Sequence, residues 1–405
     1  MKILQIASQI PLPANDGGKI SIWGVAKYLA LRGNEIHFVA YKKRTEISAV
    51  ENELRKYTTP YILDINTDDS ILGAIKNLFS RVPYNISKYH RKELKIFLIE
   101  FLKKNKIDLV IVNNLHMGWV IDVIKPIRNI PIILRQENVE MMIMKRFYEK
   151  QTNLVIRFFA YLQYKKFLKY EPNLSEKFDK CIMISQVDDN LIRDLNPSIK
   201  TSVIPVGVDS NLLKVKKNNV IPFSIVHIGQ MNWLPNYDGL QWYLNEVFPG
   251  IVEKLPHSKL FIYGGGSFDK LKILPSVKNN VEVVGFVKDI WASINDKALA
   301  VIPLRIGSGI RVKIIEMLAA GQSIITTSVG KEGIPTNDGE HIIVADSKEE
   351  MISKTVNFFN GKYNTDMITN NARKLIEEQF TWEKIAERFE FECKSLLNQK
   401  LQSNG

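Results

Sequence analysis

The sequence predicts an α/β protein with two parallel-sheet domains, and three observations support this. The chain has 405 residues, more than one ordinary hydrophobic core accommodates. Short apolar runs typical of buried strands alternate with helical patterns through both halves, as in parallel sheets with helical crossovers. In the second half, glycines follow the strands, at the sheet edge where open α/β sheets bind ligands.

The first domain is predicted to span residues 1–210. One helix is expected over Lys19–Arg32, because apolar residues recur there at helical spacing and Gly33 suits the position after a helix end. Another is indicated by apolar residues at offsets 0, 3, 4, 7 and 8 from Leu94. The strands are expected at Ile3–Ala7, Ile36–Ala40, Leu109–Val112, Ile132–Leu134 and Cys181–Ile184, with a last apolar run at Val203–Val208.

The second domain is predicted over residues 222–380, after a polar, lysine-rich linker at Asn211–Pro222. Its strands are expected at Ser224–Ile228, Leu260–Tyr263, Val281–Val284, Leu299–Pro303, Ser323–Thr326 and His341–Val344. Glycines cluster after them, at Gly229, Gly264–Gly266, Gly285, Gly307 and Gly309. Several glycines at one sheet edge indicate a floor on which a ligand lies.

Composition restricts the class of protein. No apolar stretch approaches the ~18 residues that span a bilayer, and we interpret the start of the chain as a strand rather than a signal peptide. Cys181 and Cys393 are too few for a disulfide framework, and the histidines lack metal-ligand spacing, so no metal site is expected. A cytoplasmic location fits, either free or peripheral at the inner face of the plasma membrane.

The formal net charge of +12 is concentrated in the first 200 residues, which hold 32 Lys and Arg against 21 Asp and Glu. No aromatic-basic stripe accompanies this charge, so nucleic acid is not expected as a partner. A lysine-rich composition that serves solubility and an acidic partner, such as an anionic membrane surface or a phosphorylated lipid, both stay open. For the basic, aromatic segment 142–170 we favour packing between domains over a membrane surface, because Lys165 falls within its apolar arc.

The segment from 302 to 333 carries the strongest functional pattern. An apolar run ends at Leu304, a Gly-Ser-Gly turn follows, and a helix opens that carries Arg311, Lys313 and Glu316. Backbone N–H groups at a helix start bind phosphates, and cations there oppose the helix dipole, so these cations indicate a ligand rather than stability. Two cations and a carboxylate suit a diphosphate joined to a vicinal diol, as in a nucleotide-sugar.

Several motifs together resemble family 4 retaining glycosyltransferases of the GT-B fold. They are PLPANDGG at 11–18, SVIPVGVD at 202–209, VEVVGFVKD at 281–289 and GSGIRVKIIEMLAAGQSIITT from 307 onward. The resemblance implies two Rossmann-like domains with parallel sheets facing across a cleft, and a C-terminal helix near 382–398 that packs back on the first domain. It also implies sugar transfer with retention of configuration, without a cofactor and, since no Asp-x-Asp motif appears in the expected place, without a metal.

The resemblance assigns roles to residues of the donor site. Glu316 would hold the ribose hydroxyls, and Arg311 and Lys313 would neutralise the diphosphate as it leaves. The other expected donor-binding residues are the loop glycines Gly17 and Gly18, Gly229, the base-bordering Phe286 and Val287, and Ser308, Gly309 and Ile310.

Two segments of the first domain complete the expected site. His116 resembles the family histidine beside the transferred sugar, the alternative being an ordinary loop histidine. The segment RQENVE at 135–140 resembles the subgroup's R-x-H-N-x-E pattern, and Glu137 and Asn138 in it are expected to bind acceptor. His227, in an apolar strand, is interpreted as structural.

Two positions depart from the family pattern. Ser308 stands where a glutamate is common, which puts the sugar preference in doubt. Met231 and Asn232 stand near the place of a common basic residue, so the diphosphate would depend more on Arg311 and Lys313.

The expected function is therefore a hexosyltransferase in polysaccharide or glycolipid assembly, acting on a UDP- or GDP-linked sugar and a glycan or lipid-linked acceptor. Three alternatives stay open: a catalytically inactive binding protein of this fold, a nucleotide-sugar epimerase, and a dinucleotide oxidoreductase. The last lacks the Gly-x-Gly-x-x-Gly turn after the first strand.

Overall fold

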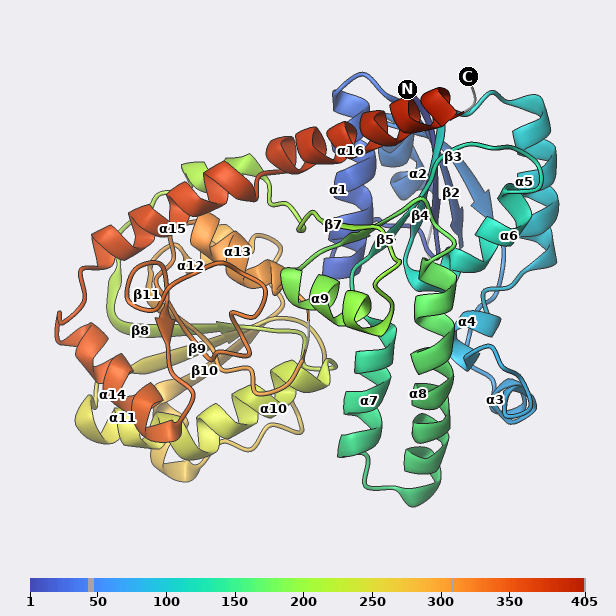
Figure 1. Cartoon of the computed structure of the whole chain (residues 1–405). Coiled ribbons are helices and arrows are strands. Elements are labelled where there is room, and N and C mark those ends of the chain that lie inside the picture. The colour runs from blue at the N-terminus through green and yellow to red at the C-terminus, as the bar shows by residue number, and fades with distance from the viewer. Residues whose placement is uncertain (43–46, 308, 404–405) are drawn as a thin grey trace. The chain divides into compact units, whose positions relative to one another are not determined.

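A computed structural model describes residues 1–42, 47–307 and 309–403, and the chain divides into two compact units. The first unit comprises Met1–Gly207 with Trp382–Gly405, and the second comprises Val208–Thr381. Each is built on a parallel sheet with helical crossovers, which confirms the predicted fold class (Figure 1). Within the described ranges, no helix combines the length and the apolar character needed to span a bilayer.

Among the described residues, the first unit has a seven-stranded parallel sheet in the order β3-β2-β1-β4-β5-β6-β7. The strands are β1 (Lys2–Ala7), β2 (Glu35–Tyr41), β3 (Thr59–Leu63), β4 (Leu109–Asn113), β5 (Ile132–Gln136), β6 (Lys180–Met183) and β7 (Thr201–Val203). The helices are α1 (Gly17–Leu31), α2 (Ile47–Arg55), α3 (Ile71–Asn77), α4 (Tyr84–Ser87), α5 (Lys92–Lys104), the 3-10 helix η1 (Leu115–Val120), α6 (Ile121–Ile124), α7 (Glu140–Lys150), α8 (Leu154–Ser175), α9 (Gln186–Leu195) and α16 (Trp382–Ser403). The strand order reverses between β1 and β4, because the chain runs outward to β3 and then returns.

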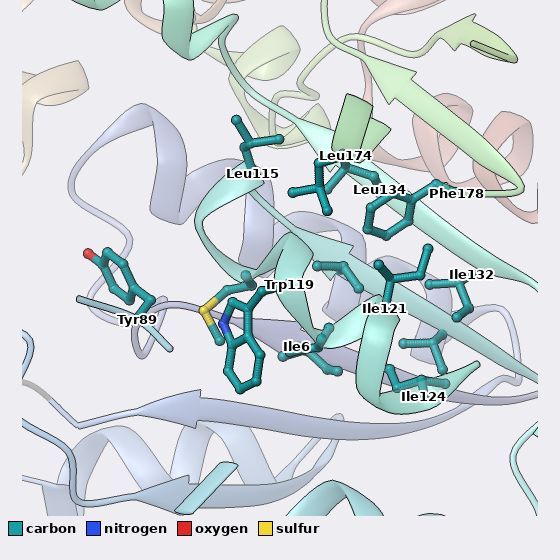
Figure 2. Packing of buried hydrophobic residues seen from close by; sticks show 14 of the residues in the cluster. Ile6, Tyr89, Leu115, Trp119, Ile121, Ile124, Ile132, Leu134, Leu174 and Phe178 are labelled. Atoms are coloured by element: carbon teal, nitrogen blue, oxygen red, sulfur yellow. The ribbon is translucent and has the colours of Figure 1, made fainter. Parts of the chain in front are cut away.

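The core of the first unit explains why its central strands are apolar on both faces. Every residue of β4 is buried, as expected for a parallel strand covered by helices on either side. Figure 2 shows Trp119, Ile121 and Ile124 of η1 and α6 packed with Ile6 of β1 and Leu134 of β5. Because β1 and β4 are packed in this core, the loops that follow their carboxyl ends begin at well-anchored positions.

The second unit repeats this plan. Its described residues form a six-stranded sheet in the order β10-β9-β8-β11-β12-β13. The strands are β8 (Ile221–Ile228), β9 (Lys259–Tyr263), β10 (Val281–Gly285), β11 (Lys297–Ile302), β12 (Ile324–Thr326) and β13 (Ile343–Val344). The helices are η2 (Ser210–Lys214), α10 (Leu234–Trp242), η3 (Tyr243–Val247), α11 (Phe248–Lys254), η4 (Pro275–Asn280), α12 (Ile290–Ile294), α13 (Val312–Ala319), α14 (Lys348–Phe359) and α15 (Thr365–Gln379). Here the strand order reverses between β8 and β11.

Local chemistry sets the ends of α1. The helix begins two residues earlier than predicted, because the Asp16 side chain caps it and accepts the Lys19 backbone N–H at 2.9 Å. It ends before Gly33, whose φ of 83° is readily adopted only by glycine. The first two helical residues are therefore Gly17 and Gly18, directly after the loop that follows β1.

Two segments at the ends of the units are held by specific contacts. The segment expected as a linker contains η2 and is packed on the second unit, where Arg373 of α15 donates to the Val215 carbonyl. In the first unit, the long helix α16 packs along α1 (Figure 1). Glu390 of α16 accepts from Arg32 at 2.8 Å and from Asn34 at 3.1 Å, at the end of α1.

Candidate functional site

One expected donor residue of the second unit, Lys313, lies where the strand order reverses, whereas Phe286 and Val287 follow the edge strand β10. Lys313, in the first turn of α13, spans this point: its Nζ donates to the Ile228 carbonyl at the end of β8 (3.0 Å) and to Asn236 Oδ1 of α10 (2.7 Å). Ligands of open α/β sheets bind beyond the carboxyl ends of the strands at such a reversal. Asn236 was not predicted, because it lies 77 residues away in sequence.

The surroundings of Lys313 favour the neutral form of its side chain. Burial, and secondarily the charge of Arg311, lowers the pKa of Lys313 to about 7. An ammonium has three N–H donors, and the two bonds above use two of them. A diphosphate beside Nζ would both accept the third and stabilise the charged form.

Arg311 occupies the N-cap position of α13, so the helix begins at Val312, one residue later than predicted. Its Nη1 donates to the Gly309 carbonyl at 2.6 Å, which folds the guanidinium back over the glycine turn. Gly309 and Ile310 are both buried in this turn. Ser308 lies outside the described residues.

Glu316 lies three residues after Lys313 and so on the same side of α13. Its side chain is half-buried, and burial raises the pKa of Glu316 to about 7. Hydroxyl groups that donated to this carboxylate would lower that pKa, because they favour the charged form. The site thus holds a lysine and a glutamate three residues apart on one helix, each in surroundings that disfavour its charged form.

The glycines after β8 and β9 let two loops touch. Gly264 has a φ of 134°, and a Cβ there would lie 1.8 Å from the Gly229 carbonyl oxygen. Gly229 in turn leaves room beside His227, whose Nε2 would lie 3.0 Å from a Cβ at 229. A larger residue at either glycine would disturb the loop that follows Ile228, whose carbonyl accepts from Lys313.

His227 is fully buried, as expected for a structural residue. Its Nδ1 lies 3.0 Å from the Val301 carbonyl and must carry the proton, since a carbonyl only accepts. Burial, then the charge of Lys313, lowers the pKa of His227 to about 3, so the ring is neutral. Among the described residues, Nε2 has no hydrogen-bond partner.

Phe286 and Val287 follow β10, an edge strand of the second sheet. Phe286 is 77% exposed, which is unusual for a large aromatic side chain. An exposed ring at the carboxyl end of a strand offers a flat apolar surface that suits a base. Its role as a base neighbour stays a prediction.

In the first unit, His116 follows β4, in η1. Its Nε2 lies 3.8 Å from the Glu140 Oε2, and its ring centroid lies 5.3 Å from that of Tyr89. Both members of the pair are largely buried, with side-chain exposures of 20% and 13%. The Glu140 carboxylate places negative charge beside the ring, which suits a position near a developing positive charge.

The fully buried Glu171 of α8 fixes the position of Glu140. Its carboxylate accepts the backbone N–H of Glu140 at 3.1 Å and that of Met141 at 2.8 Å, and the side-chain amide of Gln136 at 2.9 Å. It therefore caps α7, whose first residue is Glu140. Sequence reasoning missed both glutamates, although Glu140 closes the R-x-H-N-x-E pattern.

The arginine and Glu137 of that pattern are buried. Arg135 is wholly buried and donates to Ser21 Oγ of α1 and to the carbonyls of Ile204 and Pro205, each at 3.2 Å. Glu137 is 7% exposed, and burial, opposed by the charge of Arg135, raises its pKa to about 7. Arg135 thus ties β5 to α1 and to the chain after β7, while Asn138 is half-buried. Acceptor binding by Glu137 and Asn138 stays a prediction.

Comparisons with known proteins match part of the second unit to a family model and nearly the whole chain to a relative. Residues 222–360 match the family model described as "Glycosyl transferases group 1". A Klebsiella pneumoniae protein described as an uncharacterized 44.6 kDa protein in the cps region is 22% identical over 397 residues, 95% of this chain and 97% of the relative.

Solved structures extend the likeness to the whole chain. Sucrose-phosphate synthase from Thermosynechococcus elongatus has a TM-score of 0.67 at 14% identity, with complete coverage of both chains. Anabaena HepE, solved with UDP and glucose, has a TM-score of 0.69 at 15% identity, covering 98% of this chain and 100% of that one. The chain has the GT-B glycosyltransferase fold. In the second unit of this GT-B protein, Arg311, Lys313 and Glu316 gather on α13, where the group 1 match also lies.

Proposed function

We propose that the protein is a retaining glycosyltransferase that moves a hexose from a UDP- or GDP-linked donor to a hydroxyl of a glycan or lipid-linked acceptor. The setting proposed is cell-surface polysaccharide assembly. The observation that carries the proposal is the arrangement of Lys313 and Glu316 at the strand-order reversal of the second unit. The group 1 family match over 222–360 supports a glycosyltransferase.

The second unit binds the donor in this proposal. Lys313 and Arg311 contact the diphosphate and neutralise charge that builds on it as the glycosidic bond breaks. Glu316 accepts from the ribose hydroxyls, and Phe286 borders the base. These cations supply the charge neutralisation that other transferases obtain from a metal, so the proposed reaction needs none.

The first unit supplies the groups around the transferred sugar and the acceptor. His116, supported by Glu140, bonds a sugar hydroxyl and stabilises positive charge that develops at the anomeric carbon. The glycines at the start of α1 let backbone N–H groups approach the sugar. Because the capping Asp16 carboxylate lies beside them, sugar hydroxyls suit this place better than phosphate oxygens.

Relatives support the substrate classes. Anabaena HepE has been solved with UDP-glucose, and the pneumococcal transferase GtfA with UDP and N-acetylglucosamine. The Klebsiella relative is described by its position in a cps region. These descriptions apply to those proteins and make UDP-sugars the first donors to test.

A thermal-shift panel of UDP-, GDP-, ADP- and dTDP-sugars identifies the donor, and transfer is then measured with the purified protein. Lys313→Ala and Glu316→Ala should each abolish transfer while leaving the melting temperature of the free protein nearly unchanged. Lys217→Ala is the matched control: Lys217 also donates to a backbone carbonyl (Lys297, 2.7 Å), but at the amino end of β11. Normal turnover by either site variant, or dependence of turnover on a chelatable metal, contradicts the proposal.

A further inference from the structure

Exposed apolar side chains of the first unit lie on α3 and the two residues after it, on α8, and at one position of α7. On α3, Ile71 and Leu72 are 82% and 72% exposed, and Phe79, two residues after the end of this helix, is 91% exposed. On α8, Leu154 and Val155 are 76% and 80% exposed. The full set, called the apolar patch below, is Ile71, Leu72, Ile75, Leu78, Phe79, Phe147, Leu154, Val155, Ile156, Phe158 and Tyr161. Soluble domains rarely leave so many large apolar groups together at the surface.

Hydrogen bonds place α3 beside α8. Gln163 of α8 donates to Asn77 Oδ1 at the end of α3 (3.2 Å) and accepts the backbone N–H of Tyr84 (2.8 Å). The Tyr84 ring lies 6.4 Å from that of Phe159, and its hydroxyl accepts the Ser70 N–H at 2.6 Å. Figure 1 shows α7 and α8 as an adjacent pair with α3 and α4 next to α8. The end of α3 is thus tied to α8, and the exposed apolar side chains of both helices lie outside this contact.

The same segments carry a net charge of +8, against +12 for the whole chain. Residues 71–81 and 145–170 contain nine lysines and arginines and one acidic residue, Glu149. Along one side of α8 the exposed side chains are Leu154, Phe158 and Tyr161, followed by Lys165. Lys165 Nζ lies 5.6 Å from the Tyr161 ring centroid, so the basic group follows directly on the apolar one. The apolar arc and the lysines are therefore separated along the helix axis rather than around it.

We propose that the apolar patch is a docking surface for an anionic lipid bilayer. Apolar side chains enter the interface between headgroups and acyl chains, and the flanking lysines and arginines contact acidic headgroups. A second copy of the chain is a poorer occupant. Each surface has a net charge of +8, so two copies that met through it would repel each other. The inference goes beyond the transfer reaction and is tested without it.

The test is co-sedimentation of the full-length protein with vesicles of phosphatidylcholine alone, or of two parts phosphatidylcholine to one part phosphatidylglycerol. Each basic residue near an anionic surface strengthens binding by about fivefold. Partition into the mixed vesicles should therefore exceed partition into neutral ones at least about 25-fold and fall with added salt. Lys165→Glu with Lys169→Glu should lower it at least about 25-fold.

The apolar contribution is tested by Leu72→Ser with Phe79→Ser, which should lower partition at least about tenfold. The matched controls are Phe391→Ser with Leu401→Ser, each 71% exposed on α16, and Lys254→Glu with Lys362→Glu in the second unit. Melting curves check that every variant folds. Equal partition into both vesicle types, none into either, or equal losses in patch and control variants overturns the proposal. So does a dimer, seen by light scattering, that the Leu72 and Phe79 changes dissociate.

Discussion

Donor binding should exchange protons with solvent, and the direction should reverse across neutral pH. Lys313 and Glu316 both have a pKa of about 7 in the free protein, but binding shifts the two in opposite directions. A diphosphate raises the pKa of Lys313, so binding takes up a proton wherever the free lysine is neutral. Ribose hydroxyls lower the pKa of Glu316, so binding releases a proton wherever the free carboxyl is protonated.

The expected magnitudes follow from these pKa values. At pH 8 about nine-tenths of Lys313 is neutral, so binding takes up about 0.9 proton, less about 0.1 released by Glu316. At pH 6 the proportions reverse, and binding releases a net amount of about 0.8 proton. Above pH 7, binding takes up a proton, so donor affinity falls as pH rises. Below pH 7, binding releases a proton, so donor affinity falls as pH falls. Affinity is therefore greatest near pH 7.

The assay is titration calorimetry at both pH values, each in two buffers of different ionisation enthalpy. A UDP-sugar is the ligand, because its diphosphate diester does not titrate in this range. Lys313→Met should remove the uptake at pH 8 and keep the release at pH 6, and Glu316→Gln should do the reverse. Lys217→Met, whose lysine also has a pKa lowered by burial, to about 8, should change neither. Uptake at pH 8 that survives in Lys313→Met would refute the reasoning.

The remaining predictions concern rate and stability. His116→Ala should lower kcat more than donor affinity, and Glu140→Ala should lower kcat by about two- to fivefold, the worth of a partly exposed ion pair; a pure affinity loss in donor titrations contradicts the roles given to this pair. Gly264→Ala should lower the free energy of unfolding by about 2–4 kcal/mol, because its Cβ would meet the backbone of Gly229. Gly361→Ala, with open space around it, should lower it by only about 1 kcal/mol. Urea titrations that give the two variants equal losses exclude the close contact between Gly264 and Gly229. Arg135→Met should cost about 3 kcal/mol in the same assay, because buried carbonyls lose their donor.

Most strands that the sequence predicted are buried, although β10 was predicted and is largely exposed. A strand that was missed, β3, shows what weakens the pattern. β4 is apolar at four successive positions, and its expected bounds differ from the observed ones by one residue. β3, over Thr59–Leu63, was not predicted, because it lies at the sheet edge, contains Pro60 and is only half-buried. An edge strand pairs on one side and needs little apolar surface, so its pattern is weak.

The candidate site was predictable to the extent that it is local. Arg311, Lys313 and Glu316 lie within six residues and follow a glycine turn, so their types and spacing indicated a ligand. Asn236 and Glu171 left no such signal, because each acts on residues that are distant in sequence. Glu171 caps a helix that begins about thirty residues earlier, an arrangement that no local pattern encodes.

The sequence by itself determined the alternation of buried strands and helices, the two-sheet architecture, and the placing of cations and a carboxylate at one helix start. Tertiary structure decided how those groups titrate. Lys313 meets the Ile228 carbonyl across 85 residues, and its pKa falls because packing removes water from the ammonium. Desolvation depends on every element that surrounds a group, whereas a motif specifies only its neighbours in the chain.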